Sequence, residues 1–176
     1  MRYFYFDVDN LPEVLDNKLY ESTLKDIKSQ SMSYPQIAER VRKQKLRVQF
    51  LGVDKQGFIN FSCTSGTTPG LLHYVKIELL DLPEAVKEQG RMKDRDIINL
   101  ALFGDIKVYC SCEAFRYYFQ YISYIKGYGI HKEVRYPKVR NPRLKGSVCK
   151  HTLAVLNALP MYISSLVKAY RQRRIL

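Results

Sequence analysis

The 176-residue sequence lacks several features that would each place it in a particular class of protein. No run approaches the roughly 20 consecutive apolar residues that a membrane-spanning helix needs. The first nine residues carry one base, Arg2, and reach an acid at Asp7, which is unlike a secretory signal peptide. No internal repeat or low-complexity tract is present. We therefore expect an intracellular, globular protein in a reducing compartment, with no membrane partner and with enough chain to bury its own core.

Familiar catalytic motifs are also missing. The chain has neither the G-x-x-x-x-G-K-[ST] loop that holds nucleotide phosphates nor a G-x-S-x-G nucleophile turn. The stretch 65–70 (SGTTPG) contains glycines but no lysine and is typical of a plain turn. Asp7 and Asp9 form a D-x-D pair with no partner motif. These absences predict that the protein is not an enzyme.

Acidic residues are scarce in the C-terminal part of the chain. Residues 110–176 contain 13 basic and 2 acidic residues, a net charge of +11 in a chain whose total is +12. A smaller basic cluster lies in 37–50. Such asymmetry indicates a polyanionic partner for the C-terminal part, either nucleic acid, a phosphate-rich surface or an acidic protein.

The hydrophobic pattern predicts an α+β fold with a small antiparallel sheet and helices. Alternating apolar residues predict strands, and Asp54–Gly57 has the composition of a hairpin turn. A small polar stretch, 29–33, indicates a joint between two N-terminal helices. We divide the chain into an N-terminal segment 1–44, a central domain 45–160 and a basic helix 161–176. The expected strands are 2–8, 46–53, 58–63, 71–80 and 106–110, and the expected helices are 10–27, 35–42, 82–90, 94–103, 115–125 and 149–159.

The four cysteines and three histidines contain one informative pattern. Cys110 and Cys112 end the last predicted strand, and Cys149 and His151 open a predicted helix, so the pattern is C-x-C, 36 residues, C-x-H. Thiolates and an imidazole suit zinc, which prefers four tetrahedral ligands in structural sites. The alternative is that these cysteines are small buried hydrophobic residues. Cys63 lies mid-strand and is expected in the core, and neither His73 nor His131 is expected to be a ligand.

These motifs resemble the SWIM-type zinc finger, in which a C-x-C and a C-x-H flank a variable insert. Phe115 occupies the place of the aromatic residue that follows the first pair in that family, and Leu153, Val155 and Leu156 match its apolar helix. The resemblance covers about residues 58–160 and implies a zinc module that binds DNA or proteins. The stretch 135–160 is also similar to small SWIM-bearing proteins of tailed bacteriophages, which implies a virion component or a DNA-associated protein.

The insert between the ligand pairs, 113–148, begins as a helix and continues as a basic, proline-containing segment. Its apolar face is expected in the core, whereas Tyr117, Tyr121, Tyr124 and Tyr128 are expected to be more exposed. An extended basic arm beside tyrosines suits a phosphate backbone with stacked bases, but a solvated loop or one docked on an acidic protein fits the same pattern. The candidate residues for binding nucleic acid or another partner are Arg116, Lys126, Lys132, Arg135, Lys138, Arg140, Arg143, Lys145 and Lys150.

The sequence leaves two functions open. One is a zinc module whose basic half binds nucleic acid, and the other is a structural assembly protein whose insert and termini contact neighbouring subunits. The C-terminal helix carries an apolar stripe of Met161, Leu166, Val167 and Tyr170, for which we expect core packing or protein docking rather than a membrane surface.

Overall fold

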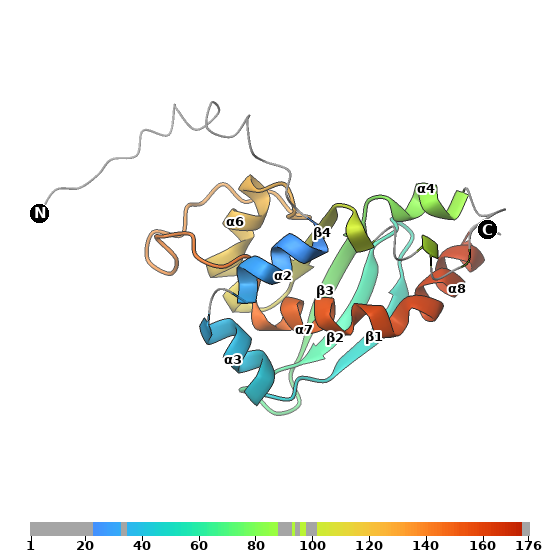
Figure 1. The fold of residues 1–176 in the computed structure, drawn as a ribbon. Coiled ribbons are helices and arrows are strands. Elements are labelled where there is room, and N and C mark those ends of the chain that lie inside the picture. Colours follow the sequence, from blue (N-terminus) through green and yellow to red (C-terminus); the bar gives the residue numbers. More distant parts are fainter. Residues whose placement is uncertain (1–22, 33–34, 88–92, 94–95, 98–101, 174–176) are drawn as a thin grey trace, which may run out of the picture.

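The computed structural model describes residues 23–32, 35–87, 93, 96–97 and 102–173. These residues form a four-stranded antiparallel sheet in the order β1-β2-β3-β4, together with helices (Figure 1). The α+β class is confirmed, as are four of the predicted strands, and the predicted strand 2–8 lies outside the described residues. The strands are β1 (Val48–Val53), β2 (Ile59–Thr64), β3 (Leu72–Leu79) and β4 (Ile106–Cys110).

The hairpin turn between β1 and β2 forms as predicted. The Asp54 carboxylate accepts hydrogen bonds from the backbone N–H groups of Gln56 and Phe58, at 3.1 and 3.0 Å. Gly57 has φ of +98°, a left-handed conformation that glycine adopts without a steric penalty. The turn sets a register in which Val53 faces Ile59.

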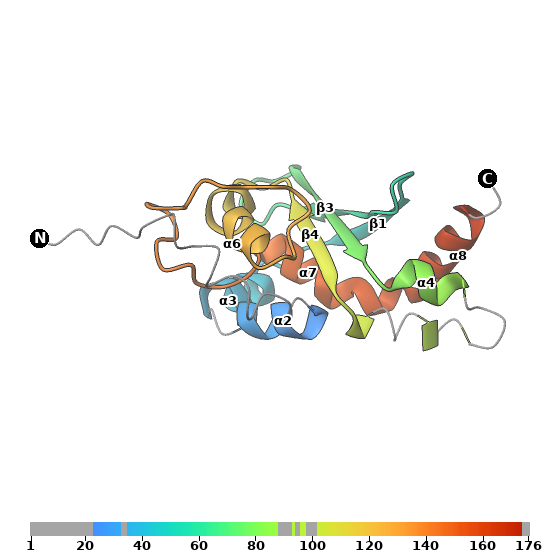
Figure 2. The ribbon, with the colours of Figure 1, turned by 90° about the horizontal axis from the view of Figure 1, so that it is seen from above.

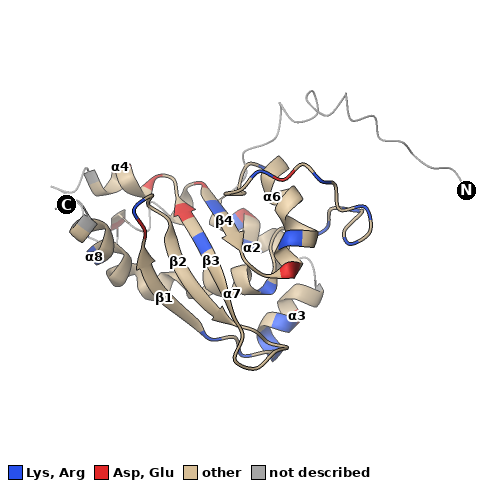
Figure 3. Ribbon diagram, turned by 180° about the vertical axis from the view of Figure 1, so that it is seen from behind, with Lys and Arg blue, Asp and Glu red and all other residues tan. Residues whose placement is uncertain are grey.

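Among the described residues, helices cover one face of the sheet. In Figure 2 α2, α3, α7 and α8 lie on one side of the strands, and Figure 3 shows the opposite face, where α6 lies beside β4 and no described helix crosses β1, β2 or β3. Residues on the covered side, such as Phe61, Val75 and Val108, are fully buried. The helices are α2 (Leu24–Met32), α3 (Pro35–Lys43), α4 (Leu82–Lys87), α6 (Gln120–Ile125), α7 (Lys150–Ala158) and α8 (Ile163–Arg173), with the π-helix η2 (Phe115–Phe119) before α6 and the 3-10 turn η3 (Leu159–Tyr162) before α8.

Helix α7 is the centre of the helical layer. It contacts all four strands, and α2 and α3 pack against it. Leu153, Val155 and Leu156 are fully buried, so the apolar helix expected after the histidine is confirmed. Ile27 of α2 and Leu166 of α8 belong to the same hydrophobic core, so both ends of the described chain contribute to it.

The predicted joint at 29–33 is wrong for its described part, because α2 continues through Met32. The polar residues there have partners in the fold. The Ser31 hydroxyl is fully buried and shares a hydrogen bond with the Ser147 hydroxyl, which also donates to the Ile27 carbonyl at 2.8 Å. Tertiary contacts therefore stabilise a helical turn that composition alone does not favour.

The helical start of the insert is confirmed, but two of its tyrosines are not where the pattern placed them. Tyr117 and Tyr124 are exposed as expected, whereas Tyr121 and Tyr128 are buried. The wider π-helical turn of η2 changes which residues face the core in α6, which explains Tyr121. Tyr128 follows the turn at Gly127, and its hydroxyl donates to the Ser147 carbonyl at 2.9 Å.

Helix α8 uses its apolar stripe for core packing. Leu166, Val167 and Tyr170 are buried, and the Tyr170 hydroxyl donates to the Gly57 carbonyl at 2.6 Å, whereas Met161 is exposed. The helical run Lys150–Tyr170 is long and apolar enough to meet the simplest criteria for a membrane span, although the sequence has no unbroken apolar run of that length. Half of that window is buried inside the fold, and a core helix meets the same criteria, so this is weak evidence for a span.

Candidate metal centre

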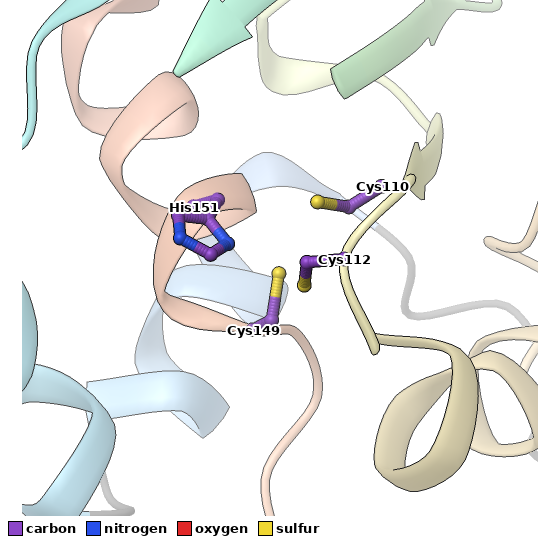
Figure 4. A group of neighbouring side chains, drawn as sticks. All are labelled: Cys110, Cys112, Cys149 and His151. Atoms are coloured by element: carbon purple, nitrogen blue, oxygen red, sulfur yellow. The ribbon is translucent and has the colours of Figure 1, made fainter. Parts of the chain in front are cut away.

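Two elements of the fold bring the C-x-C and C-x-H pairs together. Cys110 is the last residue of β4, and Cys112 follows in the turn that leads to η2. Cys149 is the N-cap of α7, and His151 lies in the first turn of that helix. Figure 4 shows the four side chains pointing toward one another from these two elements. We call them the Cys3His cluster.

The Cys3His cluster has the dimensions of a metal site. Its four ligand atoms lie within 4.8 Å of one another, and all four residues are buried. Tetrahedral zinc with Zn–S bonds of about 2.3 Å would separate two sulfur ligands by about 3.8 Å. The ligand atoms therefore need only a small contraction to bind one ion, and the cluster can hold a metal.

His151 gives independent support for a metal site. Both ring nitrogens are buried and have no hydrogen-bond partner among the described residues. Buried polar atoms are nearly always paired, and an unpaired one costs about 1–3 kcal/mol. A metal ion at the centre of the cluster would provide a partner for one of these nitrogens.

Two sulfur atoms of the cluster already accept or share hydrogen bonds with nearby groups. The backbone N–H of Phe115 donates to Cys112 Sγ at 3.3 Å, and the Thr152 hydroxyl lies 3.3 Å from Cys149 Sγ. Such contacts orient metal ligands and stabilise negative charge on sulfur. Neither was predicted from the sequence, although the Phe115 contact follows from the start of a helix three residues after Cys112.

The pKa values of the thiols show how closely they interact. Hydrogen bonding to Cys112 and Cys149, together with burial, raises the pKa of Cys110 well above its ordinary value. Burial also raises the pKa of Cys149, but hydrogen bonds from Cys110 and Cys112 outweigh it and hold that pKa well below the ordinary value. Three buried thiolates can coexist at this distance only if a cation offsets their charge.

Cys63 and His73 lie beside the cluster without joining it. They face each other across β2 and β3, and the His73 ring is 4.2 Å from the His151 ring between centroids. Cys63 is fully buried in the core as expected, and burial raises its pKa to about 12. Neither residue belongs to the group of four whose ligand atoms converge.

The predicted basic residues fall into two groups. Two of them bond elsewhere, since Lys126 Nζ donates to Gln30 Oε1 at 3.0 Å and the half-buried Lys150 donates to Gln44 Oε1 at 2.7 Å. The other seven are exposed, and one of them, Arg135, forms an ion pair with Glu133. They are Arg116 on η2 and six residues of the loop 131–148, called here the insert loop, which Figure 3 shows carrying basic residues along its length. These six are Lys132, Arg135, Lys138, Arg140, Arg143 and Lys145.

The two prolines of the insert loop had indicated an extended segment, but the loop is not extended along its whole length. It turns between Pro137 and Leu144, where the Asn141 N–H donates to the Pro137 carbonyl at 3.1 Å. The buried Asn141 amide donates to the carbonyls of Tyr118 and Lys145, each at 3.0 Å. One asparagine therefore fixes the loop against η2, and the basic residues around it are held on a defined backbone.

Comparisons with protein-family models, with curated proteins and with solved structures found no match to this chain. The description of the site therefore depends on its own geometry.

Proposed function

We propose that this protein is a non-enzymatic, SWIM-type zinc module whose basic insert loop binds nucleic acid. The observation that carries the proposal is the buried Cys3His cluster, whose ligand atoms converge from two rigid elements. A soft thiolate-rich donor set with one imidazole suits zinc. Four protein ligands complete a tetrahedron and leave no open position for a reacting group, which favours a structural role for the metal over a catalytic one.

The metal would connect the fold to the binding surface. The 36 residues between Cys112 and Cys149 begin and end at the cluster. The insert loop is the return path, and its six basic residues are exposed. With zinc bound by three thiolates the centre itself carries a net charge of about −1. The positive potential of this half of the protein therefore comes from the loop and not from the ion.

Nucleic acid is the partner that suits this loop best. Cations repeat along its backbone, and the exposed rings of Tyr117 and Tyr136 lie among them. Regular cations provide contacts to phosphates, and aromatic faces provide places for bases to stack. An acidic protein surface would pair with the cations but would not require exposed aromatic rings.

The test is a titration of the zinc-loaded protein with labelled nucleic acid at several salt concentrations. Arg135 is paired with Glu133, so five loop cations remain to neutralise phosphates, and the plot of log affinity against log salt should have a slope of about −4.5 on duplex DNA. Replacing Lys138, Arg140 and Arg143 together with glutamine should reduce the slope by about 3. A matched control replaces the exposed lysines Lys25, Lys43 and Lys168, and should change the slope little if the loop is the contact surface.

The second candidate is a structural assembly protein, such as a tailed-phage virion component. Exposed apolar side chains favour it, because the insert loop also presents Val134 and Val139, which are 66% and 88% exposed. In that case the zinc site would serve only as scaffold, and the loop would pack against neighbouring subunits. Salt-independent self-association, with no nucleic-acid binding at low salt, would favour this function over the first.

A further inference from the structure

A groove of about 500 Å³ lies beside the metal centre, between the end of β4, η2 and the start of the insert loop. This volume is within the range of about 300–1,000 Å³ that is common for small-ligand sites. The sequence had indicated some of its basic residues but not that they share a groove with the end of β4. The groove is lined by Tyr109, Cys110, Ser111, Arg116, Gln120 and residues 131–135.

The charge in the groove is positive after its ion pair is taken into account. Glu133 is the acidic residue of the lining, and Arg135 donates to its two carboxylate oxygens at 2.9 and 2.7 Å. This pairing neutralises Glu133 and holds its carboxylate in a side chain that is only 8% exposed. Arg116 and Lys132 have no ion pair among the described residues, so the three cations and one carboxylate of the lining give the groove a net charge of about +2.

Aromatic rings line the same groove. Tyr109 and His131 pack edge to face, with ring centroids 4.6 Å apart. His131 is exposed whereas Tyr109 is half-buried, so the imidazole is the ring that a ligand can reach first. The guanidinium of Arg116 lies 5.6 Å from the centre of the exposed Tyr117 ring. The groove therefore combines two free cations with accessible aromatic surface.

We propose that this groove binds one unpaired nucleotide, and that the nucleic-acid ligand of the protein is therefore single-stranded. The inference rests on the proposed function and specifies its substrate class. Arg116 and Lys132 would hold the phosphate, and the base would stack on the His131 imidazole. A base offers its face for stacking only when it is unpaired, which a duplex does not allow. The basic insert loop would then continue along the phosphates of the neighbouring nucleotides.

The groove is built on the same chain segment as the metal ligands. Cys110 both lines the groove and belongs to the Cys3His cluster, and Ser111 lies between two ligands. The Arg116 N–H donates to the Cys112 carbonyl at 3.1 Å, so the first turn of η2 fixes Arg116 relative to the metal site. The groove and the metal centre therefore share the chain segment that runs from Cys110 to Arg116.

The experiment measures the affinity of the zinc-loaded protein for labelled oligothymidylate, oligouridylate and a duplex of similar length, each about 12 nucleotides long. Arg116→Glu/Lys132→Glu is compared with Lys25→Glu/Lys168→Glu, which makes the same change in net charge on exposed side chains of α2 and α8. We expect a single-stranded ligand to bind more tightly than the duplex. The groove variant should bind the single-stranded oligonucleotides about tenfold or more weakly than the control variant.

A second measurement reports on the groove directly. The chain has three histidines, of which His151 belongs to the Cys3His cluster, His73 lies beside it and His131 lies in the groove. In two-dimensional NMR spectra of the zinc-loaded protein, a single-stranded oligonucleotide should shift the His131 ring signals and leave those of His73 in place. His131→Ala should weaken single-stranded binding more than duplex binding.

The outcomes separate the two proposals. Equal affinity for single strands and duplex, or equal affinities of the groove variant and its control, overturns the inference while nucleic-acid binding itself stands. Absence of binding to all three oligonucleotides at low salt overturns the proposed function and this inference together. Tighter single-stranded binding that depends on Arg116 and Lys132 and shifts His131 supports both, whether the strand is DNA or RNA.

Discussion

Replacing Cys112 with alanine removes one ligand of the Cys3His cluster and should release the metal. Cys63→Ala is the matched control, because it makes the same chemical change at another buried thiol whose sulfur lies outside the converging group. The ligands join the end of β4 to the start of α7, and α7 packs on all four strands. Loss of the metal should therefore loosen the contact between the sheet and its central helix.

The size of the effect follows from mass action. An ion that binds only the folded protein stabilises it by about 4.1 kcal/mol when its free concentration is a thousand times its Kd. In a chain of this length, each kcal/mol corresponds to about 2–4 °C in Tm. We therefore expect chelation of the wild-type protein to lower Tm by about 8–16 °C under those conditions. The Tm of Cys112→Ala should be low with or without chelator.

The assay is thermal unfolding followed by circular dichroism, together with the metal content of the purified protein by elemental analysis. Cys63→Ala should retain one metal ion per chain and keep its response to chelator, even if the smaller side chain lowers its Tm. The reasoning is refuted if Cys112→Ala retains a full complement of metal, or if chelator leaves the wild-type Tm unchanged.

Three further predictions concern the fold and the ionisation of its groups. Tyr128→Phe leaves the Ser147 carbonyl without its buried donor and should lower the free energy of unfolding in urea by about 1–3 kcal/mol. The control, Tyr136→Phe, changes an exposed hydroxyl and should lower it by less than about 0.5 kcal/mol. Equal effects of the two substitutions would contradict a stabilising role for the Tyr128 hydrogen bond. Burial alone would raise the pKa of Asp54, but the hydrogen bonds that its carboxylate accepts outweigh burial and lower the pKa. The ionised Asp54 carboxylate therefore stabilises the fold above about pH 4, and this stabilisation is lost as the pH falls through the folded-state pKa. Asp54→Asn should therefore flatten the acid limb of a stability–pH curve, and an unchanged limb would show that the turn carboxylate contributes nothing. Hydrogen bonding raises the pKa of Cys110, and this thiol must lose its proton to bind a metal. Zinc affinity, measured with a competing chromophore, should therefore weaken as the pH falls, by up to about tenfold per pH unit for each displaced proton. A Kd that does not change with pH would argue against thiolate ligands.

The sequence predicts the metal cluster well because its geometry is local. The C-x-C comes at the end of an alternating strand and the C-x-H at the start of an apolar helix, so each pair is placed by its own element. The two pairs are far apart in the sequence, and they come together because β4 and α7 pack into the same core. The strands around Asp54–Gly57 were predictable for the same reason.

Features that depend on tertiary contacts could not be predicted from the sequence pattern. The helical turn ending at Met32 depends on Ser31 meeting Ser147, which is 116 residues away. The burial of Tyr121 depends on a π-helical turn that shifts the helical phase, and no simple periodicity predicts such a turn. The groove combines Tyr109 with His131, and only the return of the insert loop to β4 brings these two rings together.

The Cys3His cluster also makes this fold a natural site for insertions. A single ion would hold both ends of the 36-residue segment that separates Cys112 from Cys149, so a change in length at its exposed residues 138–140 need not reach its buried residues, such as Phe115 and Tyr128. Doubling the length of a flexible loop costs only about 0.6 kcal/mol in closure entropy. A foreign peptide placed beside Val139, the most exposed large apolar residue of the loop, should therefore be displayed on the surface while the sheet and α7 remain intact.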